Sequence, residues 1–504
     1  MMRKYGAWAE KPDKIPEDKI TEHMSADVVI CGAGIAGVTC ALRAAQCGSS
    51  VIVLEKTQSW SARGGNIGVV NSAFMKSLGY ENDADEIRRE WIKRCANRCN
   101  EKLLKRYFET SPEAMDWLLD IVTKPEYNCT PVLQGSFYKG ETYRENVGSH
   151  RLFDGPMAKK GARAGSPDAV FAMYTESMKL GAKYLFSSPA VELTENDSRI
   201  TGVIAAHDGG YIKVSAKRGV VLATGDIGGN EDMCDDLSPL ANKCKMKIYA
   251  PKGANTGDGH RLGYWAGGEF EDAPFATMLH PQAYHFRNYC FLFVKPDGTR
   301  FMNEDNYVQG KTVAVLRENI DYAWSIIDDD WRNKVPQTLP YGGGLFWGGD
   351  CTAGKSEFIP EEEERMFELG IRRGVVVSAD TPQELAEKMG VPQDVFAGEF
   401  ARYNEMCRNG KDTDFGKRKE LLIPLDKPPY HAMKFGPALL AVVGGLKVNE
   451  HMQVLSSDGA IEGLYAVGNT MGGRYGVDYP VIIPGNSHGT ALTFSYILGK
   501  ELSK

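Results

Sequence analysis

The feature that most constrains this chain is a glycine-rich turn between an apolar run and a helical pattern near the N-terminus. Residues 26–31, ADVVIC, are apolar and predict a buried parallel strand. The turn GAGIAG at 32–37 follows at once, and residues 38–48 then predict a helix that ends at a glycine. A second predicted strand, 51–54, ends at Glu55. This order of strand, turn, helix, strand and acidic residue indicates a dinucleotide-binding unit.

Each part of this unit has a physical role in holding a dinucleotide. Gly32 makes the tight turn, Gly34 lets the backbone approach a pyrophosphate, and Gly37 allows the helix to pack closely on the strand. The helix N-terminus offers amide donors and the positive end of its dipole to the phosphates. The carboxylate of Glu55 would accept hydrogen bonds from adenosine ribose hydroxyls. The remaining alternative is a glycine-rich turn in an unrelated α/β protein.

Length and charge limit the rest of the molecule. A chain of 504 residues exceeds what one hydrophobic core usually serves, so we expect two domains or more. Hydrophobic residues make up 42% and charged residues 25%, which is a globular balance. The net charge of -7 argues against nucleic acid or an anionic membrane as a partner, because both favour clustered Lys and Arg.

Neither a targeting segment nor a metal site is expected. Residues 1–25 alternate charges and prolines and lack the apolar stretch of a signal peptide. The longest apolar stretch, 28–45, is interrupted by glycines and Arg43, so no membrane span is predicted. The eleven cysteines are scattered, with no spacing that suits zinc, haem or an iron–sulfur cluster. We therefore expect reduced thiols in a cytoplasmic protein.

The remaining patterns predict a discontinuous organisation. Amphipathic helical patterns cover 83–122, with a break expected near Ser111-Pro112, and 167–181. Two alternating runs within 198–217, around Asp208-Gly-Gly210, predict a hairpin. Aromatics, mixed charges and prolines then mark an inserted unit. The expected division is an N-terminal extension 1–24, a dinucleotide-binding domain of 25–274 and 433–504, and a capping domain of 275–432.

Several motifs, in order along nearly the whole chain, resemble the FAD-dependent fumarate reductase and succinate dehydrogenase flavoprotein family. The closest likeness is to its 3-ketosteroid dehydrogenase branch. The motifs are GAGIAG at 32–37, LEK at 54–56, ARGGNIG at 62–68, LATGDIGGN at 222–230, TGDGHRLG at 256–263, His280-Pro281, GTRFMNE at 298–304, GLYAVGN at 463–469 and PGNSHGTAL at 484–492. The resemblance implies an α/β fold: a Rossmann-type, glutathione-reductase-like FAD domain with an inserted α+β capping domain.

The resemblance implies FAD as the cofactor and assigns residues to it. In this family the ARGGNIG loop lies beside the flavin ring, Thr224 and Gly225 pass the adenine side, and Asp258 and Asn469 bond the ribityl chain or the diphosphate. The TGDG segment alone would also suit a turn and a helix cap. The residues expected to contact FAD are Gly32, Gly34, Ala36, Gly37, Glu55, Lys56, Arg63, Gly64, Gly65, Asn66, Val191, Ala223, Thr224, Gly225, Asp258, Gly468, Asn469, Gly485, Asn486 and Ser487.

The departures from the family concern the substrate. Fumarate reductases hold their dicarboxylate with arginines, one shortly after an R-F-x-N-E motif and one in a late glycine-rich stretch. Here the corresponding stretches, 303–309 and 477–480, contain no arginine, so fumarate and succinate are not expected as substrates. Tyr307 and Tyr479 stand there instead, as tyrosines do in ketosteroid dehydrogenases, and Gly485 would share the substrate carbonyl with Tyr479. Two extra residues before Gly485 depart from the ketosteroid pattern.

Tyrosine hydroxyls in these places suit a carbonyl-bearing substrate. One phenol can donate to a ketone oxygen and polarise an enone, and a second can move a proton at the carbon alpha to it. His280 stands in the place of a substrate-binding histidine of fumarate reductases, where a buried structural role is an equal alternative.

The expected activity is hydride transfer between flavin N5 and a C–C bond conjugated to a carbonyl, in either direction. The substrate would be a steroid-like ketone or another bulky, hydrophobic enone. A separate electron carrier is expected, because a second dinucleotide motif is not evident in the sequence. Two alternatives remain open: a reductase of an unsaturated carboxylate such as an aryl acrylate, and a flavin-binding redox protein without turnover.

Overall fold

The glycine-rich turn lies at the carboxyl end of a central strand in a sheet of eight strands. The computed structural model describes residues 5–134, 138–140, 143–162, 164–248, 253–285, 288–342, 344–345 and 358–504. The strand order in this sheet is β18 (Gln453–Ser456), β19 (Gly459–Ala466), β9 (Gly210–Leu222), β1 (Ile20–Cys31), β2 (Val51–Leu54) and β6 (Lys183–Leu185). In addition, β8 (Arg199–His207) pairs with β9, and β7 (Ala190–Asn196) pairs with β8.

Strand β1 confirms the predicted buried strand and extends it toward the N-terminus. It runs parallel to β2, with Val28 opposite Val51, and parallel to β9 on its other side. The predicted strand covered only the last part of β1, because its first part, from Ile20, is mostly exposed and polar. That part is held by pairing with β9 rather than by apolar burial.

The other predicted elements of this half are also present. Helix α1 (Ile35–Gln46) follows the turn and packs against α15 (Asn486–Glu501) and α6 (Ser166–Lys179). Strands β8 and β9 form the predicted hairpin, in which Asp208 and Gly209 have φ angles of 46° and 79°. Positive φ at both central positions is typical of the tight turns that join antiparallel strands.

The expected helix break near Pro112 is wrong. Helices α3 (Ala84–Arg94) and α4 (Glu101–Val122) are separated at residues 95–100, and Pro112 lies inside α4. The break occurs where Asn100 caps α4 by accepting hydrogen bonds from the N–H groups of Lys102 and Leu103. Tertiary packing therefore outweighs the loss of one helical hydrogen bond at Pro112, since eleven side chains of α4 are buried.

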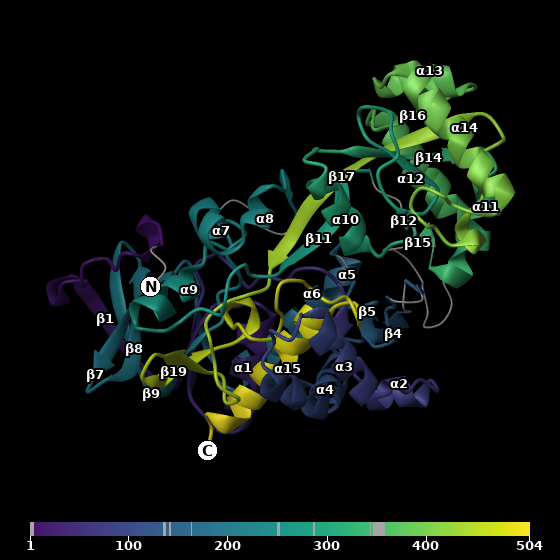
Figure 1. Cartoon of the computed structure of the whole chain (residues 1–504). Helices are drawn as coiled ribbons and strands as arrows, with labels where there is room; N and C mark the ends of the chain where they lie inside the picture. The colour runs from purple at the N-terminus through teal and green to yellow at the C-terminus, as the bar shows by residue number, and fades with distance from the viewer. Residues whose placement is uncertain are drawn as a thin grey trace.

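A second sheet, mostly antiparallel, is centred on the long strand β17 (Tyr430–Val442). The strands of this sheet are β10 (Met246–Lys247), β11 (Thr277–Tyr284), β13 (Leu292–Val294), β14 (Ala323–Asp328), β16 (Val376–Ala379) and β17. The helices around it are α10 (Val308–Arg317), α11 (Trp331–Thr338), α12 (Pro360–Arg372), α13 (Pro382–Met389) and α14 (Gln393–Asn409). Figure 1 shows β17 running from the region of helices α11 to α14 toward the first sheet.

Each sheet has its own apolar core. One cluster of buried side chains surrounds β1, β2 and β9, and another surrounds β14, β17, α13 and α14. The mixed α/β class with two such parts agrees with the prediction, whereas the exact domain boundaries stay a prediction. Strand β1 crosses the expected boundary at residue 25, and β17 crosses the one at 433.

The remaining elements are short. They are β3 (Ile67–Gly68), β4 (Thr130–Gln134), β5 (Ser149–Phe153), β12 (Asn288–Tyr289), β15 (Gly344–Leu345), α2 (Ala73–Ser77), α5 (Pro156–Lys159), α7 (Glu231–Leu237), α8 (Pro239–Asn242) and α9 (Asp258–Trp265). Over the described part of the chain, the helices fall short of the combined length and apolar character that crossing a bilayer needs.

Candidate cofactor-binding and active site

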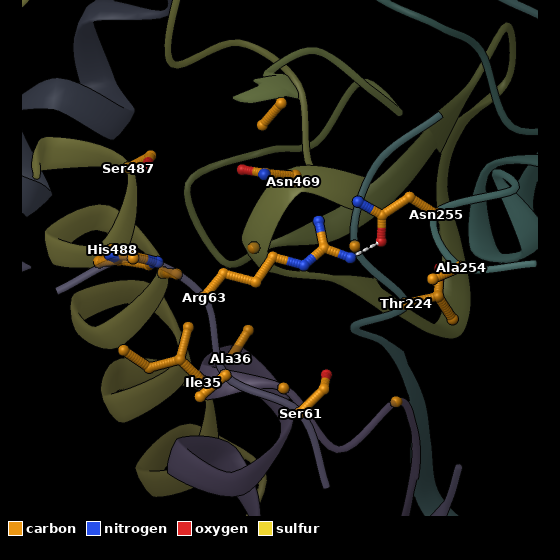
Figure 2. Close-up of a pocket in the computed structure, with 18 of the residues that line it drawn as sticks. Ile35, Ala36, Ser61, Arg63, Thr224, Ala254, Asn255, Asn469, Ser487 and His488 are labelled. Carbon is orange, nitrogen blue, oxygen red and sulfur yellow. Dashed lines mark hydrogen bonds between the residues drawn. The ribbon is translucent and has the colours of Figure 1, made fainter. Parts of the chain in front are cut away.

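A cavity of about 560 Å³ lies where the two sheets meet. Its wall combines the glycine-rich turn, the carboxyl ends of β2 and β9, the first turn of α15, and side chains of β11 and β17. Figure 2 shows Ile35 and Ala36 of α1 on one side of the cavity and Asn469 and Asn255 on others. Segments that are far apart in the sequence are therefore brought to one site, which is of a size typical for a bound ligand.

The turn is shaped by the absence of side chains at two of its glycines. A Cβ atom on Gly37 would overlap the carbonyl oxygen of Gly32, because α1 begins directly against the strand. A Cβ atom on Gly34 would meet no atom within 4 Å, and Gly34 lines the cavity. Gly32 has a φ of 109°, which favours glycine, and its N–H donates to Leu54 O at 2.7 Å. The turn thus offers bare backbone at the N-terminus of α1, which suits a phosphate group.

Glu55 lies at the end of β2 and lines the same cavity. Its Oε2 accepts a hydrogen bond from Ala33 N at 2.7 Å, and its Oε1 accepts from Thr57 N at 2.9 Å. These bonds fix the carboxylate beside the turn. Each carboxylate oxygen can accept more than one bond, so both keep capacity for ribose hydroxyls.

The ARGGNIG loop crosses the cavity with Arg63. Figure 2 shows the Arg63 side chain extending across the site toward Asn255. Its guanidinium donates to Asn255 Oδ1 and lies 3.3 Å from Asp226 Oδ2, which also accepts from Asn255 Nδ2 at 2.7 Å. Burial raises the pKa of Asp226, and Arg63 opposes that rise. The loop backbone is close-packed as well, since a Cβ on Gly165 would overlap Gly65 O.

Comparison with known proteins identifies the family of this chain. The sequence profile of the FAD binding domain family matches residues 27–481. The chain belongs to this FAD binding family. It is an FAD-dependent oxidoreductase that acts on C=C bonds, as its relatives do. The FAD-binding prediction and the predicted fold class are therefore confirmed.

Three relatives and one solved structure show the breadth of this likeness. The vinyl phenol reductase of Lactiplantibacillus plantarum is 27% identical over 94% of this chain and 95% of its own length. The 3-oxosteroid 1-dehydrogenase of Mycolicibacterium smegmatis is 26% identical over 95% and 97%. The NADH:fumarate oxidoreductase of Klebsiella pneumoniae is 25% identical over 95% of this chain, which spans 48% of that protein. The open conformation of a flavocytochrome c3 fumarate reductase has a TM-score of 0.72, with 22% identity over 99% and 82% of the two chains.

Most of the residues expected to contact FAD line the cavity. Those that do are Gly32, Gly34, Ala36, Glu55, Lys56, Arg63, Gly64, Gly65, Asn66, Ala223, Thr224, Gly225, Asp258, Gly468, Asn469, Gly485 and Ser487. Gly37 supports the turn from behind, and Val191 follows the lining residues Pro189 and Ala190 on β7. Asn486 is fully buried, and its Nδ2 donates to Pro480 O at 2.8 Å. Their roles toward FAD stay predictions.

The charged groups of the FAD site are paired with one another. Lys56 Nζ lies 2.8 Å from Asp258 Oδ2, and Arg261 binds the other carboxylate oxygen at 2.8 Å. Burial acts to raise the pKa of Asp258, but Lys56, Thr256 and Arg261 together bring it below its usual range. These pairs keep the ionised side chains oriented along the cavity wall.

Two of the predicted catalytic residues, Tyr479 and Gly485, meet at the first turn of α15. Tyr479 lines the cavity, is 2% exposed, and its hydroxyl oxygen accepts from Ser487 N at 3.2 Å. Gly485 lies in the same wall, with a φ of 83°, and among the described residues no atom accepts its N–H. Burial raises the pKa of Tyr479, with Tyr475 as a further cause, so its phenol stays protonated. His280, on β11, also lines the cavity.

Tyr307 lies outside this cavity lining, at the N-terminus of α10. Its hydroxyl donates to Asp478 Oδ2 at 3.1 Å, so it contacts the loop that carries Tyr479. Its ring stacks on Tyr143 with centroids 3.8 Å apart and an interplanar angle of 17°. The two predicted tyrosines are therefore joined through Asp478 rather than placed on one cavity surface.

Sequence reasoning missed several residues of the site. Asp226 and Asn255 hold Arg63, and His488 Nδ1 donates to Asn66 O at 2.8 Å on the cavity wall. Asp478 lies directly before Tyr479 in the stretch already noted for its lack of arginine. A signal for Asp226 and His488 existed, because they lie inside the glycine-bearing motifs at 222–230 and 484–492. Their partners, in contrast, are far away in the sequence.

Proposed function

We propose that this chain exchanges hydride between bound FAD and a C–C bond conjugated to a carbonyl of a bulky, largely apolar substrate, such as a steroid-like ketone. The observation that carries the proposal is the pairing of Tyr479 and Gly485 in the cavity wall. The hydrogen bond from Ser487 N uses the Tyr479 oxygen as an acceptor, so the hydroxyl hydrogen is not consumed by it. Two donors in one wall suit a single carbonyl oxygen.

The charges in the cavity support a neutral substrate. Among the described lining residues, the side chains that carry a fixed positive charge are Lys56 and Arg63, and both are paired with carboxylates. A dicarboxylate would need an unpaired, bidentate cation. The substrate side of the wall instead contains Met278, Leu440 and Val481. This composition favours an enone over fumarate.

The residues have the following proposed roles. FAD, when bound, supplies the hydride exchange at its N5 atom. Tyr479 and the Gly485 N–H donate to the carbonyl oxygen and stabilise the negative charge that develops there. Tyr307 moves the proton at the carbon alpha to the carbonyl. His280 orients the substrate, and the cavity-lining residues of the expected FAD set hold the cofactor. The similarity to a vinyl phenol reductase supports aryl-bearing alkenes as a second candidate class.

Removing either hydroxyl tests this proposal. We expect Tyr479→Phe and Tyr307→Phe to lower enone turnover by ~10²-fold or more, as for a lost oxyanion donor or general acid. Each change leaves a partner without its hydrogen bond, which costs about 1–3 kcal/mol, so FAD content and melting are measured alongside turnover. The assay is anaerobic flavin bleaching or reoxidation with cyclic enones, aryl acrylates, a vinyl phenol and fumarate.

Tyr496→Phe is a suitable control, because its hydroxyl donates to Glu113 at 2.7 Å, away from the cavity. This variant should keep the normal rate. Two results would contradict the proposal: both Tyr479→Phe and Tyr307→Phe retaining near-normal rates, or the unmodified protein preferring fumarate to cyclic enones.

A further inference from the structure

Asp478 is held by three groups at the junction between the capping helix α10 and the loop before α15. Its Oδ2 accepts from the Tyr307 hydroxyl at 3.1 Å, and its Oδ1 accepts from Tyr479 N at 2.9 Å. Gln309 Nε2 donates to Oδ1 as well and lies 3.3 Å from Tyr479 O. The carboxylate is therefore fixed in one orientation, with one oxygen turned to Tyr307.

Gln309 also ties this junction to the cavity. Its Oε1 accepts from Leu279 N at 3.1 Å, and Leu279 precedes the cavity-lining His280 on β11. One amide thus connects α10, β11 and the Asp478–Tyr479 loop. The position of the Asp478 carboxylate is coupled to the wall that faces the substrate.

The surroundings make isolated ionisation of Tyr307 unfavourable. Burial raises the pKa of Tyr307, and the neighbouring Asp478 raises it further. Burial also raises the pKa of Asp478, against the effects of Tyr307, Gln309 and the Arg94 guanidinium. A tyrosinate beside a carboxylate would place two negative charges together. A proton can leave Tyr307 at low cost only if Asp478 takes it in the same step.

We infer that Asp478 is a positioning residue that acts through Tyr307, taking its proton when a substrate is dehydrogenated and returning it when a substrate is reduced. This inference rests on the proposed function. In dehydrogenation the alpha C–H bond breaks and an O–H bond forms on Tyr307, while the original Tyr307 proton moves to the Asp478 carboxylate. The hydride from the beta carbon would pass to FAD when it is bound. Reduction of the enone reverses each of these transfers.

Asp478 could instead have a purely structural role and only anchor the loop. Substitutions distinguish this structural role from the proposed proton transfer. Asp478→Asn keeps the size of the side chain and an oxygen acceptor, but it cannot take up a proton. Asp478→Glu restores a carboxylic acid. Tyr138→Phe is the matched control, because the buried Tyr138 hydroxyl donates to Asp305 Oδ1 at 3.2 Å in a second tyrosine–aspartate pair of the same part of the molecule.

The experiment measures kcat and KM against pH in both directions for the FAD-loaded protein. We expect Asp478→Asn to lower kcat by ~10²-fold with KM and FAD content nearly unchanged, Asp478→Glu to recover part of the rate, and Tyr138→Phe to match the unmodified protein. Dehydrogenation should rise as pH rises through the elevated pKa of Asp478, since the carboxylate must be ionised. The rate of reduction should fall over the same pH range, and both pH-dependent changes should be absent in Asp478→Asn.

The other titratable or charged groups that face Asp478 do not produce this pH-dependent change in rate. They are Arg94, Tyr143, Tyr307 and Cys95. Burial raises the pKa of Tyr143 to about 12, and the pKa values of Tyr307 and Cys95 are raised further. An arginine guanidinium such as that of Arg94 is not deprotonated in proteins, so it cannot produce a pH-dependent change. Loss of the pH-dependent change in Asp478→Asn therefore assigns that change to Asp478.

Two outcomes would overturn the inference. One is an Asp478→Asn variant with a normal rate and pH profile while Tyr307→Phe is inactive, which would leave the proposed function intact. The other outcome comes from infrared difference spectra, which need no substrate. We expect these spectra to show a carboxylic acid band that is absent in Asp478→Asn and shifted in Tyr307→Phe. A band that Tyr307→Phe leaves unchanged would exclude the coupling between Asp478 and Tyr307. Failure of every enone as a substrate would instead reject the proposed function.

Discussion

Gly34 and Gly37 lie within one turn of α1, yet each lacks a side chain for a different reason. Gly37 must lack a side chain because α1 packs on the Gly32 carbonyl, whereas Gly34 must lack one only because it faces the cavity proposed to hold FAD. Gly37→Ala should therefore destabilise the FAD-free protein by about 1–3 kcal/mol, as for an overpacked site. Gly34→Ala should leave that stability unchanged and weaken FAD binding by about tenfold or more, or ~1.4 kcal/mol.

Thermal melting of the FAD-free protein and titration with FAD separate the two variants. Gly48→Ala serves as a control, because Gly48 ends the same helix region with open space around it. Its φ of 89° still adds strain, so a small loss of stability with normal FAD affinity is expected there. Equal melting temperatures for the Gly34 and Gly37 variants would contradict this account of the turn.

At the residue scale, sequence motifs predicted the members of the site better than their contacts. Glu55, Gly34 and Asn469 were expected at the cofactor and line the cavity, since each lies in a motif with a fixed local geometry. The links from Arg63 to Asp226 and from Tyr307 to Asp478 join positions more than 160 residues apart. Such pairs depend on how the two sheets meet, and a single sequence carries no signal for that.

At the element scale, hydrophobic periodicity predicted several strands and helices around the first sheet but misplaced some of their ends. Helix α4 continues through Pro112 because its buried face outweighs one lost bond, and β1 begins at Ile20 because it pairs with β9. Neither effect is visible in local sequence pattern, since both arise from tertiary contacts. The N-terminal residues before β1 were likewise expected to be a mere extension.

The N-terminal segment instead packs on the FAD-binding half. Trp8 is 8% exposed, its Nε1 donates to Asp236 Oδ2 at 2.7 Å, and its ring lies 5.1 Å from Tyr5 and 6.0 Å from Tyr264. We expect Trp8→Ala to lower the free energy of unfolding by about 3 kcal/mol, through the lost apolar burial and the lost hydrogen bond to Asp236, which keeps its bond from Gly6 N. Chemical denaturation monitored by flavin release measures this effect.

An exposed apolar residue provides the comparison for Trp8. Leu78 is 49% exposed, so Leu78→Ala should change stability by no more than about 0.5 kcal/mol. If Trp8→Ala behaved like Leu78→Ala, the N-terminal segment would be peripheral to the fold, and the expected boundary near residue 25 would be favoured.

At the scale of the whole molecule, function depends on the junction of two unlike sheets. The first sheet contains the parallel β1–α1–β2 unit, whose glycine-rich turn suits a dinucleotide, whereas the strand pairs of the second are antiparallel except β10 with β17. The cavity lies between them, and the proposed proton path enters from α10 beside the second sheet. Composition predicted that two parts exist, but their relative placement, which creates the site, came only with the structure.

This arrangement predicts how electrons reach the flavin. Within the described part of the chain, one parallel unit with a glycine-rich turn is present, and we propose that FAD binds there. NADH or NADPH would then lack a binding site of its own near the flavin, so either should reduce the FAD of this 504-residue chain only slowly. Reduced viologen, which needs no specific site, should support turnover of an enone. Stopped-flow spectra of the flavin under anaerobic conditions measure both rates, and rapid stoichiometric oxidation of NADH by the pure protein would reveal a nicotinamide site that the fold does not suggest.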